Sequence, residues 1–257
     1  MAISFVSSTV SANTASATAL PVPYPASITI GNPLVLVVGV KPFNAVITTP
    51  DGWIPLGQIT NGSTAQGVDT GSVLMAAFAR EAVGGETGNL TVAITSGNSA
   101  YGAMYRYTKA GNQSAQFALA TGTDTTVGTA WSVAYSSNPG ITSGDHLVLG
   151  GVYPTDAANT VSASAFAATS ATIAGIIATG DQNPRVTTGN QLGGNTNHCN
   201  CSAGTASANG TWTATHTLAT NNAGSAVLVR IREIPLPSAK SPYTIGRLAN
   251  RRSILVH

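Results

Sequence analysis

The sequence has few charged residues and no long hydrophobic run. Asp, Glu, Lys and Arg make up 8% of its 257 residues, whereas hydrophobic residues make up 43%. A membrane-spanning helix needs about 20 consecutive apolar residues, and the clearest apolar run near the start covers only residues 34–40. The hydrophobic residues instead form regularly spaced clusters, which supply enough apolar surface to offset chain entropy. We therefore expect a folded protein that does not enter a membrane.

Motifs for catalysis and cofactor binding are also missing. The sequence contains no G-x-S-x-G nucleophile elbow, no phosphate-binding loop and no G-x-G-x-x-G dinucleotide motif. Its nine carboxylates are scattered over turn-like segments, and no spacing selects two of them as an acid and base pair. The sequence therefore predicts neither an enzyme nor a bound cofactor.

The two cysteines lie close together, in the run His198-Cys199-Asn200-Cys201. Two thiolates with this spacing and one imidazole suit a soft metal ion, although a structural zinc site has four protein ligands as a rule. A disulfide within the pair would be strained, whereas one between two chains would not be. The Gly- and Asn-rich surroundings also fit two free thiols in a loop, so His198, Cys199 and Cys201 are weak metal candidates beside two alternatives.

Short runs of alternating apolar and polar residues, bounded by Gly, Pro, Asn and Asp, are typical of strands and turns. Many short strands at intervals of about 8 to 12 residues indicate a sandwich or barrel. The fold class that this pattern predicts is all-β, an antiparallel β-sandwich. The predicted strands cover residues 27–30, 34–40, 73–80, 90–95, 101–108, 131–135, 146–152, 172–178, 211–218 and 226–231.

A weak internal repeat divides the predicted sandwich into two halves. The segment 31–39 resembles 144–151, since both run from a Gly-Asn or Gly-Asp turn into an apolar strand. The segment 101–107 resembles 225–231, and both carry an arginine close to their end. We therefore predict an N-terminal extension over residues 1–24 and a sandwich over 25–233. Its halves cover about 25–140 and 141–233.

Several short motifs resemble a jelly-roll-like β-sandwich module found in many structural proteins of bacteriophage particles. These are the Leu34-Val35-Leu36 strand after a turn, Pro50-Asp51-Gly52-Trp53 with the following Ile-Pro-Leu-Gly, the segment 90–97, and a strand that ends in Tyr105-Arg106. The segment 144–233 resembles the return half of that module. The resemblance implies a virion protein of the tail or fibre apparatus, or a decoration protein of the capsid. It brings no catalytic residues.

A carbohydrate-binding module for attachment to a cell surface is the alternative function. Aromatic rings on one sheet face or in loops stack on sugars, and the candidates are Trp53, Trp131, Tyr101 and Tyr135. Proline and glycine around Trp53 predict instead a turn that places this ring in the core. The expected partners are other virion proteins and copies of the same chain, with host-surface glycans under the alternative.

The basic residues gather at the C-terminus. Residues 1–229 hold five Lys and Arg against eight Asp and Glu, whereas residues 230–257 hold six against one. Prolines end the last strand, so we predict an extended basic arm over residues 234–257 that docks on a neighbouring subunit. Four spaced cations without an aromatic platform do not favour nucleic acid, and a solvated tail is the other reading. The arm residues expected to make contacts are Tyr243, Ile245, Arg247, Leu248, Arg251, Arg252 and Ile254.

Overall fold

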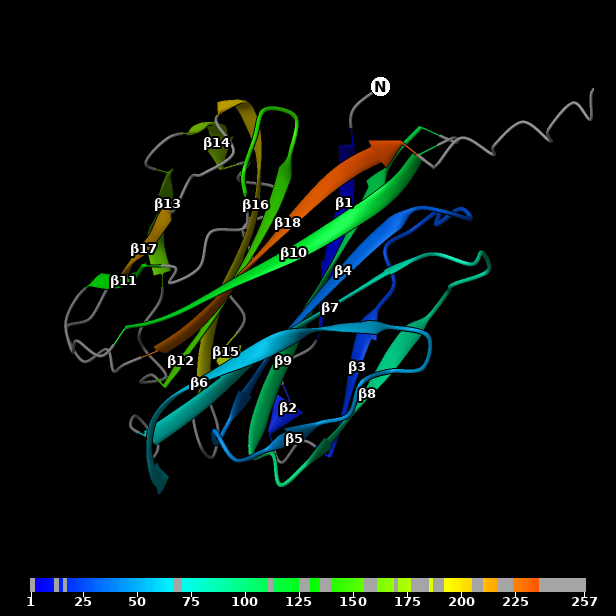
Figure 1. Cartoon of the computed structure of the whole chain (residues 1–257). Helices are drawn as coiled ribbons and strands as arrows, with labels where there is room; N and C mark the ends of the chain where they lie inside the picture. The colour runs from blue at the N-terminus through cyan, green and yellow to red at the C-terminus, as the bar shows by residue number, and fades with distance from the viewer. Residues whose placement is uncertain are drawn as a thin grey trace, which may run out of the picture.

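A computed structural model describes most of the chain up to residue 235. The described residues are 3–11, 14–15, 18–66, 71–110, 113–124, 130–134, 140–154, 161–168, 171–176, 185–186, 192–204, 210–216 and 224–235. Their regular secondary structure consists of strands, which pair antiparallel in four sheets (Figure 1). The all-β sandwich prediction is therefore confirmed. Within these ranges, no helix is long and apolar enough to cross a membrane.

The first half of the chain forms one large and one small sheet. The large sheet has the order β1-β9-β4-β7-β6, with β2 beside β9, and the small sheet has the order β3-β8-β5. The strands are β1 (Ser4–Val10), β2 (Thr14–Ala15), β3 (Ala19–Pro23), β4 (Pro33–Lys41), β5 (Val46–Ile47), β6 (Ile54–Gln66), β7 (Gly71–Glu81), β8 (Asn89–Thr95) and β9 (Ser99–Thr108).

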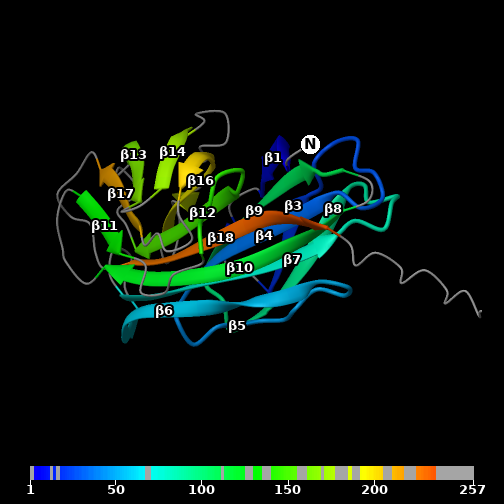
Figure 2. The same cartoon turned by 45° about the horizontal axis from the view of Figure 1, so that its top comes forward.

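The second half repeats this arrangement. Its large sheet has the order β10-β18-β12-β16-β14, with β15 beside β16, and its small sheet has the order β11-β17-β13. The strands are β10 (Gln113–Asp124), β11 (Ala130–Ala134), β12 (His146–Pro154), β13 (Val161–Ala168), β14 (Ala171–Ile176), β15 (Arg185–Val186), β16 (Leu192–Gly204), β17 (Gly210–His216) and β18 (Gly224–Pro235). The two small sheets lie on opposite sides of the molecule (Figures 1 and 2).

Apart from the two-residue strands β2 and β15, the two halves correspond strand by strand. The two large sheets have the same order when β1 is matched with β10, β9 with β18, β4 with β12, β7 with β16 and β6 with β14. The small sheets also match, β3-β8-β5 with β11-β17-β13. The repeat changes over between β9 and β10, so the predicted division near residue 140 is wrong. The predicted N-terminal extension 1–24 is also wrong, because β1 pairs with β9 and β3 pairs with β8.

The main hydrophobic core lies between the two large sheets. We call it the inter-sheet core; it draws side chains from β4, β7 and β9 on one side and from β12, β16 and β18 on the other. Because neighbouring side chains of a strand point to opposite faces, the other face of the first large sheet is free to pack elsewhere. That face forms a second core with β3 and β8, which bury Leu20, Val22, Val92 and Ile94. The first large sheet is therefore the middle of a layered structure, with the inter-sheet core on one face and the second core on the other.

The predicted strand at residues 27–30 is wrong. These residues form turns, in which Ser27 has a φ of 59° and the Ile30 side chain is 79% exposed. The alternation of Ser, Ile and Thr that suggested a strand therefore reflects one half-buried and one exposed isoleucine in a turn. Ile28 packs against the second core, whereas Ile30 points outward.

Candidate functional site

The strongest local feature is a turn that occurs once in each half, directly before the central strand. In the first half, the Asn32 Oδ1 atom accepts a hydrogen bond from the Thr29 amide (3.0 Å), and the Asn32 amide donates to the Thr29 carbonyl (3.1 Å). In the second half, Asp145 and Thr142 make the same two contacts at 2.7 and 3.2 Å. The glycine before each acidic or amide residue has a positive φ, 80° and 87°, which glycine adopts without strain.

An arginine from the last strand of each half fixes this turn. Arg106 on β9 donates from Nε to Asn32 Oδ1 (2.8 Å) and from Nη1 to the Ala26 carbonyl (2.6 Å). Arg232 on β18 makes a two-point contact with Asp145, from Nε to Oδ1 (2.7 Å) and from Nη2 to Oδ2 (2.6 Å). The hydrogen bond to Asp145 raises the pKa of Arg232. These charged groups therefore hold the sheet ends together.

Replacing Arg232 with lysine should lower the free energy of unfolding by about 1 to 2 kcal/mol, because an ammonium cannot reproduce the two parallel hydrogen bonds of a guanidinium. Urea denaturation at pH 7 measures this loss. Arg80→Lys is the matched control, since Arg80 contacts the Glu86 carboxylate only through Nη2 at 3.3 Å. Its other contacts, from Nε to the Glu81 carbonyl at 3.5 Å and with the Trp53 ring, involve no carboxylate. Equal losses in both variants would contradict the structural role of the two-point contact.

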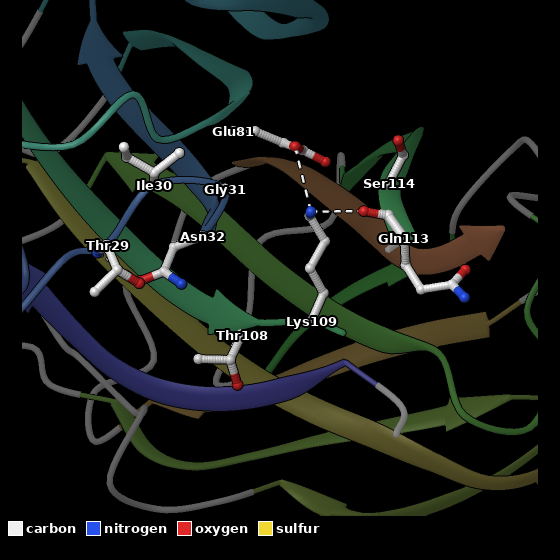
Figure 3. A pocket seen from close by; sticks show the side chains of 9 residues that line it. All are labelled: Thr29, Ile30, Gly31, Asn32, Glu81, Thr108, Lys109, Gln113 and Ser114. Atoms are coloured by element: carbon white, nitrogen blue, oxygen red, sulfur yellow. Dashed lines mark hydrogen bonds and ion pairs between the residues drawn. The ribbon is translucent and has the colours of Figure 1, made fainter. Parts of the chain in front are cut away.

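A hollow lies where the first half joins the second. It has a volume of about 470 Å³ and is lined by the turn 29–32 of the first half and by the beginning of β10 (Figure 3). The Lys109 ammonium donates to the Gln113 carbonyl (2.6 Å) and pairs with the Glu81 carboxylate at 3.5 Å. A smaller hollow of about 220 Å³ occupies the corresponding place beside the turn 142–145. The lysine in the larger hollow is thus engaged by protein atoms, in a contact that joins the two halves.

The His198-Cys199-Asn200-Cys201 run does not lie in a loop, as the sequence suggested. It belongs to β16, inside the second large sheet, and both thiols are free. Since neighbouring residues of a strand face opposite ways, His198 points to the opposite face from Cys199 and Cys201. The three candidate ligands therefore do not converge. Among the described residues, no group of three or more His, Cys, Asp or Glu side chains could hold a metal ion.

Burial makes both thiols poor nucleophiles and poor ligands. Cys199 is fully buried, and desolvation raises the pKa of its thiol far above the usual value. Desolvation, helped by the nearby Asp145 carboxylate, raises the pKa of Cys201 to about 12. Because the thiolate is the reactive and metal-binding form, both groups stay protonated and act as small apolar side chains at neutral pH.

Because the Cys199 thiol is buried, two substitutions that differ by one oxygen atom should differ in their effect on stability. Cys199→Ser should lower the free energy of unfolding by about 1 to 3 kcal/mol more than Cys199→Ala, because serine buries a hydroxyl without a prepared partner. The expected shift in Tm between the two variants is several degrees, measured by differential scanning calorimetry. Equal melting of the two variants would show that water reaches this position.

Two of the four aromatic residues proposed for sugar stacking are core residues. Tyr101 is fully buried and Trp53 is 5% exposed, with the Arg80 guanidinium 5.8 Å from the Trp53 ring centre. Trp131 lies on β11, and Tyr135 lies outside the described residues. The carbohydrate-binding alternative therefore depends on Trp131 and Tyr135, and a glycan array with Trp131→Ala as control would test it.

The predicted arm falls largely outside the described residues. β18 continues to Pro235, so Ile234 and Pro235 belong to the sheet and not to an arm. The residues from Tyr243 to Ile254 that were proposed to make contacts follow the last described residue.

Sequence reasoning missed the arginine-fixed turns, although they leave a signal. Ile28-Thr29-Ile30-Gly31-Asn32 and Ile141-Thr142-Ser143-Gly144-Asp145 share the pattern Ile-Thr-x-Gly followed by Asn or Asp. Only the second part of this pattern entered the predicted repeat. Comparison with known proteins adds no further constraint: no family model, no curated protein and no solved structure matches the chain.

Proposed function

We propose that this chain is a structural subunit of a bacteriophage particle, either in the tail or fibre apparatus or as a decoration protein on the capsid. The observation that carries the proposal is the duplicated sandwich with one shared core. Arg106, Arg232 and the Lys109 ammonium hold turns and sheet ends together. Such a body suits a rigid building block that acts through its surface, without catalysis.

The strand pairing supports the resemblance to a jelly-roll module. In the first half, β1 pairs with β9, β3 with β8 and β4 with β7, so that each early strand pairs with a late one in nested order. In the second half, β10 pairs with β18, β11 with β17 and β12 with β16. A jelly roll is built from nested antiparallel pairs of this kind in two sheets. We therefore interpret each half as a jelly-roll-like unit.

The subunit would assemble with copies of itself and with other virion proteins. Its basic C-terminal residues are the segment that we propose to dock on a neighbour. Ordering a free segment costs about 1 to 2 kcal/mol per backbone residue. The apolar residues of the segment must then be buried on a partner, and its backbone must gain hydrogen bonds there.

The decisive test is to search for this chain by mass spectrometry in particles purified from an induced or infected host. We expect it as a stoichiometric component, and its absence from intact particles would end the proposal. A second experiment uses the chain with residues 238–257 deleted. This variant should melt within a few degrees of the parent and yet fail to enter particles.

A further inference from the structure

The edge of the second large sheet at β10 lacks the features that protect sheet edges from further pairing. Among the described residues, β10 pairs only with β18, through an unbroken register of twelve residue pairs. Natural edge strands are protected by lysines, prolines or bulges. β10 contains no proline and no lysine. The other three edge strands of the large sheets, β1, β6 and β14, each carry a register shift.

One contact shows which groups of β10 face outward. The Ala115 amide donates to the Glu81 carboxylate (2.7 Å), which belongs to the other large sheet and not to β18. Because alternate residues of an antiparallel strand direct their amides to opposite sides, the amides of Phe117, Leu119 and Thr123 also point away from β18. A strand laid along this edge could pair with the amides of Phe117, Leu119 and Thr123, whereas the Ala115 amide is already bonded to Glu81.

A half-buried apolar row runs beside the same edge. Ala115, Phe117 and Leu119 of β10, with Leu56 and Ile59 of β6, pack against the inter-sheet core without being fully covered. The two strands approach closely here, since a Cβ atom built on Gly57 of β6 would lie 2.7 Å from the Leu119 Cδ2 atom. An added strand would therefore bury apolar side chains against this row, beyond forming main-chain hydrogen bonds.

The C-terminal residues 236–257 have the length and charge to occupy this edge. These 22 residues carry four Lys and Arg and no Asp or Glu, whereas residues 1–229 have a net charge of −3. At the edge itself the Glu81 carboxylate already pairs with Lys109 at 3.5 Å and accepts the Ala115 amide, so the attraction comes from the net negative charge of residues 1–229 as a whole. The segment also supplies Tyr243 and Ile245 at the alternate spacing of one strand face.

The direction of β18 favours a second copy as the source of the segment. Pro235, the last residue of β18, pairs with Gln113, the first residue of β10. The segment of the same chain therefore starts at the beginning of β10 and could follow its outer edge only in parallel. A segment from a second copy has no such restriction and can pair antiparallel, in the more stable geometry.

We propose that the outer edge of β10 binds residues 236–257 of a second copy as an added antiparallel strand. The inference rests on the proposed assembly role of the C-terminal segment and names its docking place. Because each chain offers one segment and one edge, the contact can close as a reciprocal dimer or continue from chain to chain.

Disulfide trapping in the full-length chain tests the place, the direction and the source of the strand. Thr123→Cys, at the far end of β10, is combined in turn with Ser238→Cys, Ser241→Cys or Thr244→Cys. The matched control combines Ser114→Cys, near the start of β10, with the same three substitutions. Cysteines on adjacent strands come close enough to form a disulfide. The native Cys199 and Cys201 are buried and should not interfere.

We expect mild oxidation to give covalent dimers and longer chains in the Thr123→Cys set, at a several-fold higher yield than in the Ser114→Cys set. Disulfides within single chains in the Ser114→Cys set would overturn the proposal in favour of docking on the chain's own edge. An absence of linked chains in both sets would overturn it as well. A chain absent from particles that still gives the expected links would refute the virion role alone.

A second measurement does not depend on introduced cysteines. In sedimentation velocity experiments, Tyr243→Ser/Ile245→Ser should remain monomeric at concentrations at which the parent chain associates. The other side of the molecule provides the comparison, since Val6→Ser replaces an exposed apolar residue of the edge strand β1. Val6→Ser should associate like the parent. Loss of association in Val6→Ser alone would place the contact at β1 and overturn the proposal.

Discussion

Replacing Tyr101 with alanine should lower the free energy of unfolding by about 3 to 5 kcal/mol, the usual range for removal of a large buried aromatic side chain. Tyr101 on β9 is fully buried in the inter-sheet core. Its ring occupies space left by two glycines, one from each half of the molecule. A Cβ atom built on Gly39 of β4 or on Gly194 of β16 would lie 2.4 Å from the Tyr101 Cε1 atom. Alanine would therefore leave a cavity that reaches from one large sheet to the other.

The hydroxyl of Tyr101 provides the matched comparison. It donates to the Gly151 carbonyl of β12 at 2.5 Å, so that a residue of the first half is bonded to the backbone of the second. Tyr101→Phe keeps the ring and should cost only about 1 to 2 kcal/mol, the price of one buried hydrogen bond. Urea denaturation of the parent and both variants gives the two values. A loss below about 1 kcal/mol in Tyr101→Ala would mean that the sheets do not close on this ring.

The internal repeat could be recognised from sequence only where its strands are strongly apolar. The related segments 31–39 and 144–151 begin at the same turn and lead into β4 and β12, which occupy equivalent central places. The segments 101–107 and 225–231 lie on β9 and β18, which are also equivalent. The boundary could not be found, because β10 contains only two bulky apolar residues, Phe117 and Leu119, among small and polar ones.

Strand β16 shows why the pattern of hydrophobic residues was not sufficient to predict every strand. Its sequence is rich in Gly, Asn and Cys, which are poor or neutral strand formers, and it was read as a loop. In the structure its glycines make room for aromatic rings of other strands. A Cβ atom on Gly193 would lie 2.4 Å from the Tyr153 ring, as one on Gly194 would from Tyr101. The residues that look least like a strand are therefore required by its neighbours, which no local pattern reveals.

The edge strands β1 and β6 escaped prediction for a different reason. Both are edge strands of the first large sheet, and several of their side chains are half exposed. Their sequences consequently contain Ser, Thr, Gly and Asn, as turns do. The position of His198 was missed because of β16. In a loop this histidine would be a candidate metal ligand, whereas in β16 the sheet encloses it.

The stability of the protein should fall by about 3 kcal/mol between pH 6.5 and pH 4 because of His198. This side chain is fully buried, and its ring stacks on Phe5 at a centroid distance of 3.5 Å. Neither ring nitrogen has a hydrogen-bond partner within the described part of the chain. Burial, followed by the nearby His146, lowers the pKa of His198 from 6.5 to about 4.

The direction of the effect follows from which state takes up the proton first. Below pH 6.5 the imidazole becomes protonated in the unfolded chain, whereas in the folded chain it stays neutral until about pH 4. Acid therefore favours unfolding throughout this window, and no further loss from His198 is expected once the folded state is protonated too. His146 adds to the same trend, since burial also lowers its pKa, although a backbone hydrogen bond with Ile3 and the Asp145 carboxylate oppose the shift.

His198→Phe removes the titrating group and keeps a ring against Phe5. We expect this variant to be at least as stable as the parent at pH 7, because two unpaired buried nitrogens are replaced by carbon. Its free energy of unfolding should fall much less than that of the parent when urea denaturation is repeated at pH 7, 6, 5 and 4.5. His146→Phe is the matched control and should remove a smaller part of the slope, since His146 is less completely buried and lies beside Asp145. A parallel loss of stability in the parent and in His198→Phe over this range would mean that the imidazole is already charged in the folded protein. The packing of β1 against β16 through Phe5 would then differ from that described.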